Sequence, residues 1–141
     1  MKRFLVVALL IVAACGASSS GDRSSQICSA IAGLGGNSDD FKRMTTADRA
    51  EDAYAALDRM AERTRSAIAG LQAIDGPVGL EANKLAAVEQ GLLPILEQFR
   101  NATDQAGWTS ARDAYTRWYN QSVPVIEGVS SRLGALGVHC G

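Results

Sequence analysis

Residues 45–75 read TTADRAEDAYAALDRMAERTRSAIAGLQAID, and this stretch decides the fold. Small or apolar side chains recur in it every three or four residues, which is the period of one face of an α-helix. Thr45 and Asp48 have the spacing of a capping box at the start of such a helix. The run Asp75-Gly76-Pro77 predicts the end of the helix and a turn. The spacing is typical of a seam in an antiparallel bundle, and its positions are Ala50, Ala53, Leu57, Met60, Thr64, Ala67, Leu71 and Ile74, with Ile68 beside them.

Two segments further along the chain repeat this period. Each of them, 80–103 and 108–136, predicts one long helix. Pro94 and Pro124 lie inside these predicted helices, where a proline removes a backbone hydrogen bond and bends the helix. No segment alternates with a period of two over the length of a strand, so we expect no sheet. The two seams are Leu85, Val88, Leu92, Ile95, Phe99 and Ala102 in the first, and Trp108, Ala111, Tyr115, Trp118, Ser122, Val125, Val129 and Leu136 in the second.

Upstream of residue 45 the pattern is weaker. A short helix is expected over 26–34, where the apolar residues share one face and nearby glycines end the helix. Residues 37–45 are mostly polar and contain Phe41 and Met44, which predicts an extended connection with two anchoring side chains. This connection would run the remaining length of the bundle.

The chain begins with an export signal. Lys2 and Arg3 are positively charged, residues 4–14 are an unbroken apolar run, and two alanines precede Cys15. This run is shorter than the about 20 residues that a transmembrane helix needs. The run Val12-Ala13-Ala14-Cys15 resembles the lipobox of bacterial lipoproteins. That resemblance implies that residues 1–14 are removed and that Cys15 becomes a lipid-bearing N-terminus.

The residues after Cys15 support this resemblance over a plain secretory signal. The sequence GASSSGDRSS, residues 16–25, is polar and rich in serine, which predicts a flexible tether between a lipid and a folded domain. The expected organisation is therefore a signal peptide over 1–14, a lipidated cysteine and tether over 15–25, and a helical domain over 26–141. Frequent Arg, Ala and Gly with little Lys would suit a GC-rich genome, and with the lipobox they suggest an actinobacterial lipoprotein.

The remaining cysteines predict a disulfide. With Cys15 lipidated, Cys28 and Cys140 form an even pair in an oxidising, exported setting. Short turns make the long helices antiparallel, and this topology brings both cysteines to the same end of the bundle. The alternative, a zinc site that uses His139 with Cys140, would have two adjacent ligands and one distant cysteine, which is not zinc-site spacing. The predicted fold is an all-α antiparallel bundle of three long helices and one short N-terminal helix, closed by a Cys28–Cys140 disulfide.

Charge and motifs argue against several functions. Without residues 1–14 the chain has 12 basic and 15 acidic side chains, and it contains no basic patch for nucleic acid. His139 is the only histidine. Motifs for a di-iron site, covalent haem attachment or a phosphate-binding loop are missing from the sequence. We therefore expect no enzyme, no metal and no cofactor.

The middle of the predicted bundle departs from good packing. Thr64, Gly91 and Ser122 are small or polar at seam positions where leucine would pack better. The prolines fall near this layer, and five aromatic residues cluster beside it, namely Phe99, Trp108, Tyr115, Trp118 and Tyr119. One hypothesis is close helix packing around filled aromatic space. The alternative is a pocket for an apolar or aromatic ligand, lined by Thr64, Gly91, Trp118, Tyr119 and Ser122 and covered by residues 35–45.

Two functions follow from these features. The first is a non-enzymatic lipoprotein, anchored outside the cytoplasmic membrane, that binds a protein or another envelope component. The alternative is a carrier or sensor of a small hydrophobic ligand, such as a haem-like or lipid-like molecule. In architecture the chain resembles the small haem-carrying proteins of mycobacteria, without a shared motif. Tyr115 or Tyr119 would be the hypothetical haem ligand.

Overall fold

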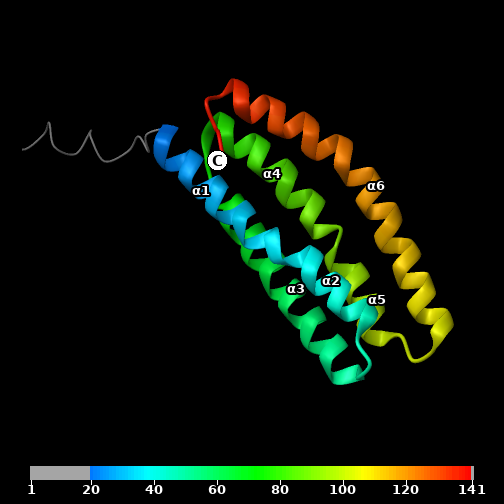
Figure 1. Ribbon diagram of the computed structural model, residues 1–141. Helices are drawn as coiled ribbons and strands as arrows, with labels where there is room; N and C mark the ends of the chain where they lie inside the picture. Colours follow the sequence, from blue (N-terminus) through cyan, green and yellow to red (C-terminus); the bar gives the residue numbers. More distant parts are fainter. Residues whose placement is uncertain (1–19, 141) are drawn as a thin grey trace, which may run out of the picture.

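The computed structural model describes residues 20–140, all of whose regular elements are helical (Figure 1). The predicted signal peptide, Cys15 and the first part of the tether lie outside the described residues. In chain order the elements are α1 (Ser20–Ala32), the 3₁₀ helix η1 (Gly33–Gly36), α2 (Asn37–Thr46), α3 (Ala50–Gln72), α4 (Gly76–Gln90), α5 (Leu93–Asn101) and α6 (Gln105–Ala135). They form an all-α bundle, as predicted. No helix within residues 20–140 is both long enough and apolar enough to cross a membrane.

The first rod of the bundle is longer than expected. Helix α1 begins at Ser20, so residues 20–25 are helical and not part of a flexible tether. Helices α1, η1 and α2 follow one another without a break, because the backbone at Ala32, Gly36 and Asn37 stays in the right-handed helical region. The predicted N-terminal helix is present as α1 but begins earlier than expected, whereas the extended lid over 35–45 was wrong because η1 and α2 are helical there. Figure 1 shows this rod running along α3.

A buried charge explains why α2 was missed. Its inward face contains Asn37, Asp40, Phe41 and Met44, which have helical spacing, but two of them are polar. Asp40 and Met44 are buried against the bundle. Because Asp40 is bound by arginines of α3, a carboxylate can occupy a position where an apolar residue would have revealed the helix.

Helix α3 lies at the centre and confirms the predicted seam from Ala53 to Leu71. It contacts α1, η1, α2, α4 and α5. The predicted capping box was wrong, because Arg49 precedes the helix and no side chain caps it. The hydroxyl of Thr45 instead donates to the carbonyl oxygens of Phe41 and Lys42, both at 3.1 Å, and so belongs to the end of α2.

The helix predicted over 80–103 is two helices. Helix α4 starts at Gly76, where a φ of +70° suits glycine, and ends at Gln90. The chain then turns at Gly91-Leu92, and α5 begins at Leu93. Pro94 therefore lies in the first turn of α5, where its missing N–H removes no helical hydrogen bond. The expectation that Pro94 interrupts a helix interior was wrong, whereas Pro124 does lie inside α6.

Both ends of α6 are well defined. At its start the Asp104 carboxylate accepts a hydrogen bond of 2.8 Å from the backbone N–H of Gly107. At its end Gly137 has a φ of +84°, and the N–H of Val138 donates to the Leu133 carbonyl at 2.9 Å. This six-to-one hydrogen bond is a Schellman motif, and it turns the chain back towards α1.

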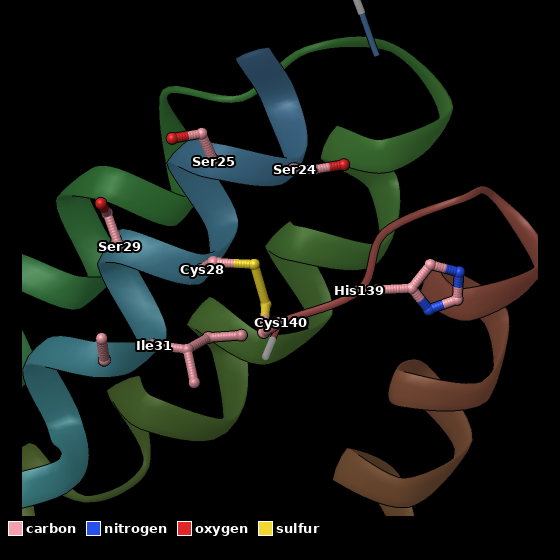
Figure 2. A pocket seen from close by; sticks show the side chains of 8 residues that line it. Ser24, Ser25, Cys28, Ser29, Ile31, His139 and Cys140 are labelled. Atoms are coloured by element: carbon pink, nitrogen blue, oxygen red, sulfur yellow. A yellow bond between two sulfur atoms is a disulfide. The ribbon is translucent and has the colours of Figure 1, made fainter. Parts of the chain in front are cut away.

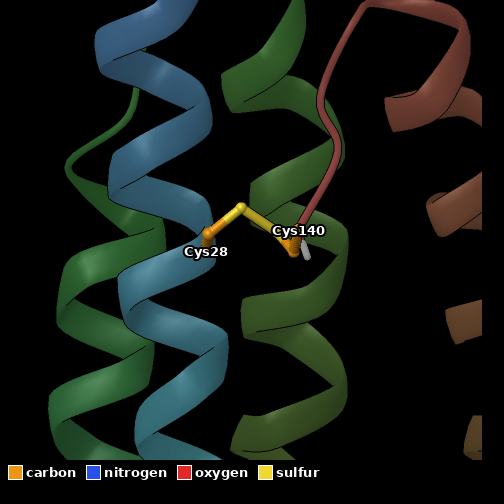
Figure 3. Close-up of a disulfide and its surroundings, with 2 residues drawn as sticks. All are labelled: Cys28 and Cys140. Carbon is orange, nitrogen blue, oxygen red and sulfur yellow. A yellow bond between two sulfur atoms is a disulfide. The ribbon is translucent and has the colours of Figure 1, made fainter.

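The predicted disulfide is present. Cys28 of α1 and Cys140 are bonded, with their Cα atoms 5.3 Å apart and a sequence separation of 112 residues (Figure 3). The antiparallel arrangement of the rods brings the two ends of the domain together, as the topology argument predicted.

The hydrophobic interior has two parts, one towards the disulfide and one towards the opposite end. The disulfide-end core consists of Ile27, Ile68, Leu71, Ile74, Val78, Ala82, Leu85, Ala86, Val129, Leu133 and Val138. The far-end core consists of Met44, Ala53, Ala56, Leu57, Met60, Ala61, Leu92, Ile95, Leu96, Phe99 and Ala111. Along α3, the change from one core to the other occurs at Thr64.

Candidate functional site

Polar side chains mark the boundary between the two cores. Thr64 of α3, Glu89 of α4 and Ser122 of α6 are buried, and each lies in sequence between residues of the disulfide-end core and of the far-end core. We call these three residues, with Gly91 and Trp118, the middle layer. Of the predicted small and polar layer, Thr64 and Ser122 are buried, whereas Gly91 is exposed at the turn after α4.

The structure brings Gly91 and Trp118 together. A Cβ atom on Gly91 would lie 3.2 Å from Cδ1 of the Trp118 ring and 3.2 Å from the Val88 carbonyl oxygen. The Trp118 indole N–H donates a 2.9 Å hydrogen bond to that same carbonyl. Trp118 thereby fills the space beside Gly91 and binds the end of α4. This contact favours the close-packing hypothesis over a ligand pocket at Gly91.

The other predicted pocket residues have different surroundings. Thr64 is fully buried, and its hydroxyl accepts a 3.2 Å hydrogen bond from the side-chain amide of Asn37 on α2. The Ser122 hydroxyl donates to the backbone carbonyl of Trp118 at 2.7 Å, one turn earlier in α6. Tyr119 has 55% of its surface exposed. Of the five predicted pocket residues, Gly91 and Ser122 therefore both contact Trp118, whereas Thr64 is hydrogen-bonded to α2.

Five aromatic rings contact one another in a continuous series. Four of them belong to the predicted cluster, and the fifth is Phe41, not the predicted Tyr119. Phe41 stacks on Tyr115 with ring centroids 3.9 Å apart, and Tyr115 lies 5.5 Å from Trp118. Phe99 packs edge-on against both Phe41 and Trp108. Through these rings, α2 contacts α6 across the far-end core. Tyr115, one of the two hypothetical haem ligands, is thus covered by Phe41.

Two of the buried carboxylates have cationic partners. Asp40 accepts hydrogen bonds from Arg59 at 2.7 and 3.0 Å and also binds Arg63. Glu81 accepts a 2.7 Å hydrogen bond from Arg132 of α6 and binds Lys84 of its own helix. These partners stabilise the ionised carboxylates and connect α2 to α3 and α4 to α6.

The pKa values reflect these contacts. Hydrogen bonds from Arg59 hold the pKa of Asp40 below its ordinary value, although burial acts in the opposite direction. Hydrogen bonds from Lys84, and then from Arg132, lower the pKa of Glu81 in the same way. Both groups therefore remain ionised at neutral pH.

Glu89 is the functional candidate that the sequence analysis missed. Only 9% of its surface is exposed, and its side-chain carboxyl group has no hydrogen bond or ion pair with the other described residues. Burial raises its pKa from the ordinary 4.5 to about 7. Burial also raises the pKa of the neighbouring Tyr115, with smaller contributions from Tyr119 and Glu89. The available signal was an acidic residue one turn after Leu85 and three residues before Leu92, both of them core residues.

A shallow hollow lies beside the disulfide (Figure 2). Ser24, Cys28 and Ile31 of α1 and His139 and Cys140 of the C-terminal segment are among its lining residues. The His139 ring extends away from the sulfur atoms in Figure 2, and it lies near Gly134 at the end of α6. Within residues 20–140, no group of three or more His, Cys, Asp or Glu side chains is arranged to hold a metal ion.

Comparisons with known proteins identified no relative of this chain. No protein family, no curated protein and no solved structure matches this chain.

Replacing Gly91 by alanine tests whether the middle layer is packed. The new Cβ would press on Trp118 and on the Val88 carbonyl, so we expect the free energy of unfolding to fall by about 1–3 kcal/mol. Gly128→Ala in α6 is the matched control, because its Cβ would meet only the end of Arg132 at 3.4 Å. That control should be neutral or stabilising by up to about 1 kcal/mol. Urea unfolding of both variants makes the comparison, and equal stability would instead indicate free space beside Gly91.

Proposed function

We propose that this protein is a lipid-anchored bacterial lipoprotein that acts outside the cytoplasmic membrane by binding a protein or another envelope component, without catalysis. The observation that carries the proposal is the Cys28–Cys140 bond downstream of a lipobox. Disulfides persist in oxidising compartments, and a lipid on Cys15 would leave this pair as the remaining cysteines. The anchor and the disulfide thus support the same location.

The position of the anchor favours one end of the bundle for contact with a partner. The lipid and tether would join the domain at Ser20, at the end where the disulfide lies. The connections between α2 and α3 and between α5 and α6 lie at the opposite end (Figure 1). That end would face away from the membrane.

The end opposite the anchor has a hollow with both aromatic and polar walls. Tyr54 of α3 and Trp108 of α6 contribute rings to it, and Arg100 contributes a charge that is paired with Asp58. Amphipathic aromatic residues and arginine are enriched where proteins bind one another. We call this hollow the far-end hollow, and its lining is Ala50, Tyr54, Arg100, Asn101, Ala102, Thr103, Asp104 and Trp108.

The carrier hypothesis has less support. It requires open space in the middle layer, but the Trp118 ring occupies the space beside Gly91. Phe41 covers Tyr115, and Thr64 is engaged by Asn37. We therefore place the proposed binding at the surface of the bundle and not in its interior.

Fractionation of cells that produce the full chain tests the anchor. Wild-type protein should partition into the detergent phase, because two or more acyl chains hold a protein firmly at a membrane. Cys15→Ala should remain unprocessed or become soluble. Cys28→Ser is the control, since it removes a cysteine but leaves the lipobox intact. Wild-type protein that is wholly soluble outside the cell would contradict the proposal.

The same cells test the binding. A photo-cross-linking residue placed at Tyr54, in the far-end hollow, should give an adduct of one defined mass in intact cells. A cross-linker at Tyr119, which is exposed on the side of α6, is the matched control and should give less of that adduct. The absence of an adduct from both positions would contradict a stable partner.

A further inference from the structure

Three carboxylates are buried in the described domain, and one of them differs from the others. Asp40, Glu81 and Glu89 are each at least nine-tenths buried. Arginines bind Asp40 and Glu81, whereas Glu89 has no cationic partner among the described residues. An ionised carboxylate without a partner is costly to bury, so this position favours the protonated acid.

The elements packed around Glu89 provide no charge to compensate it. From α6 the titratable group nearest in effect is Tyr115, whose pKa is raised first by burial and then by Tyr119 and Glu89. The cations of α3, α5 and α6 that make interhelical contacts are engaged elsewhere, since Arg59 and Arg63 bind Asp40, Arg100 binds Asp58 and Arg132 binds Glu81. Burial accordingly raises the pKa of Glu89 to about 7.

The place of Glu89 on its helix adds a second, independent reason. It is the penultimate residue of α4, directly before the turn at Gly91-Leu92. The C-terminal end of a helix has a partial negative charge, which disfavours an anion there. The Leu92 N–H donates to the Glu89 carbonyl at 3.0 Å, so the residue is part of the break itself.

A tryptophan holds α6 against this break. The Trp118 indole N–H donates to the carbonyl of Val88, the residue immediately before Glu89. An ionised Glu89 would draw in water to solvate its charge. That water would also reach the hydrogen bond from Trp118, because Glu89 and the Val88 carbonyl both lie in the last turn of α4. Loss of the bond would release α6 from the junction of α4 and α5.

We propose that Glu89 is a proton-operated latch. When Glu89 is protonated, Trp118 of α6 keeps its hydrogen bond to the end of α4, beside the α4–α5 break. When Glu89 is ionised, that contact is loosened. The latch makes the packing of the middle layer sensitive to pH near neutrality. It is independent of the lipid anchor, since all of its groups lie in the folded domain.

The effect of pH on stability has a defined sign. The pKa of Glu89 is raised in the folded protein, so unfolding releases a proton above the ordinary pKa of 4.5. Stability therefore decreases as the pH rises from about 4.5 to about 7 and does not decrease further above that range. Asp40 and Glu81 act in the opposite direction and at lower pH, because their pKa values are lowered.

The test compares the full-length wild type with Glu89→Gln, which mimics the protonated side chain. The NMR chemical shift of the Trp118 indole proton should move in the wild type with a midpoint near pH 7, and it should stay constant in Glu89→Gln between pH 5 and 8.5. The wild-type thermal midpoint should fall by about 5 °C or more from pH 5 to pH 8, and that of Glu89→Gln should change much less.

His139→Gln is the control, because it places glutamine at the only histidine of the chain, away from the middle layer. This variant should keep the wild-type transition. A Trp118 signal that is independent of pH in the wild type would overturn the latch. A transition that persists unchanged in Glu89→Gln would overturn it as well. If Glu89→Gln does not fold, the wild-type thermal midpoints alone decide, and equal values at pH 5 and pH 8 would refute the proposal.

Discussion

Cys28→Ser should lower the free energy of unfolding by about 2–5 kcal/mol. The bond joins residues 112 apart in sequence, and in the chain-entropy model a loop of this length gives the upper part of that range. The bond also holds the C-terminal segment against α1. Without the bond, this segment would be held only by the burial of Val138 and by the Schellman hydrogen bond. Chemical denaturation of the oxidised protein, followed by circular dichroism, measures the change.

Two further samples separate the bond from the side chain. Cys140→Ser, and wild type reduced with a thiol, should both reproduce the loss, because each removes the same constraint on the unfolded chain. A loss under about 1 kcal/mol in all three would mean that the unfolded chain is already compact enough to keep its two ends close.

Phe99→Ala should be the most damaging substitution in the far-end core, with a loss of about 3–5 kcal/mol. Phe99 is fully buried, and its ring packs against Phe41 of α2 and Trp108 of α6, with centroids 6.2 and 5.4 Å away. Truncation would leave a cavity where α2, α5 and α6 meet. Thermal and urea unfolding measure the loss.

Leu80→Ala is the matched control for Phe99→Ala. Leu80 is an apolar residue in α4 that is 67% exposed, so its truncation should cost only a few tenths of a kcal/mol. A loss at Phe99 as small as that at Leu80 would mean that the neighbouring rings close over the gap. In that case the far-end core would be more plastic than the ring contacts indicate.

The long apolar seams were sufficient to predict most of the fold. Helix α3 follows its predicted seam from Ala53 to Leu71. The α6 seam was only partly right, because Val129 is buried but Val125 and Leu136 are exposed. The antiparallel order correctly predicted that Cys28 meets Cys140. Patterns of this length are informative because burial of one face of a helix dominates its stability, whatever the details of its caps. The lipobox and its function remain predictions, since they concern residues outside the described part of the chain.

The prediction of helices failed at two places. In one a polar residue faces the interior, and in the other a proline is compatible with two backbone arrangements. Helix α2 was missed because Asp40 interrupts its apolar stripe, and only Arg59 and Arg63 on another helix make that position acceptable. The α4–α5 break was missed because a proline is compatible with either a bent helix or the first turn of a new one. At the break the ring of Trp118 packs against Gly91, where a larger side chain would not fit.

Periodicity and counting along one chain were sufficient to predict the helical class, the antiparallel order and the cysteine pairing. Contacts between helices could not be predicted in this way: Trp118 fills the space beside Gly91, and Asp40 and Glu81 have cationic partners while Glu89 has none. The physical reason is that solvation and ion pairing depend on which side chains meet across helices. Two glutamates on the same helix thus have pKa values that are shifted in opposite directions, because cations bind Glu81 whereas Glu89 is buried without one.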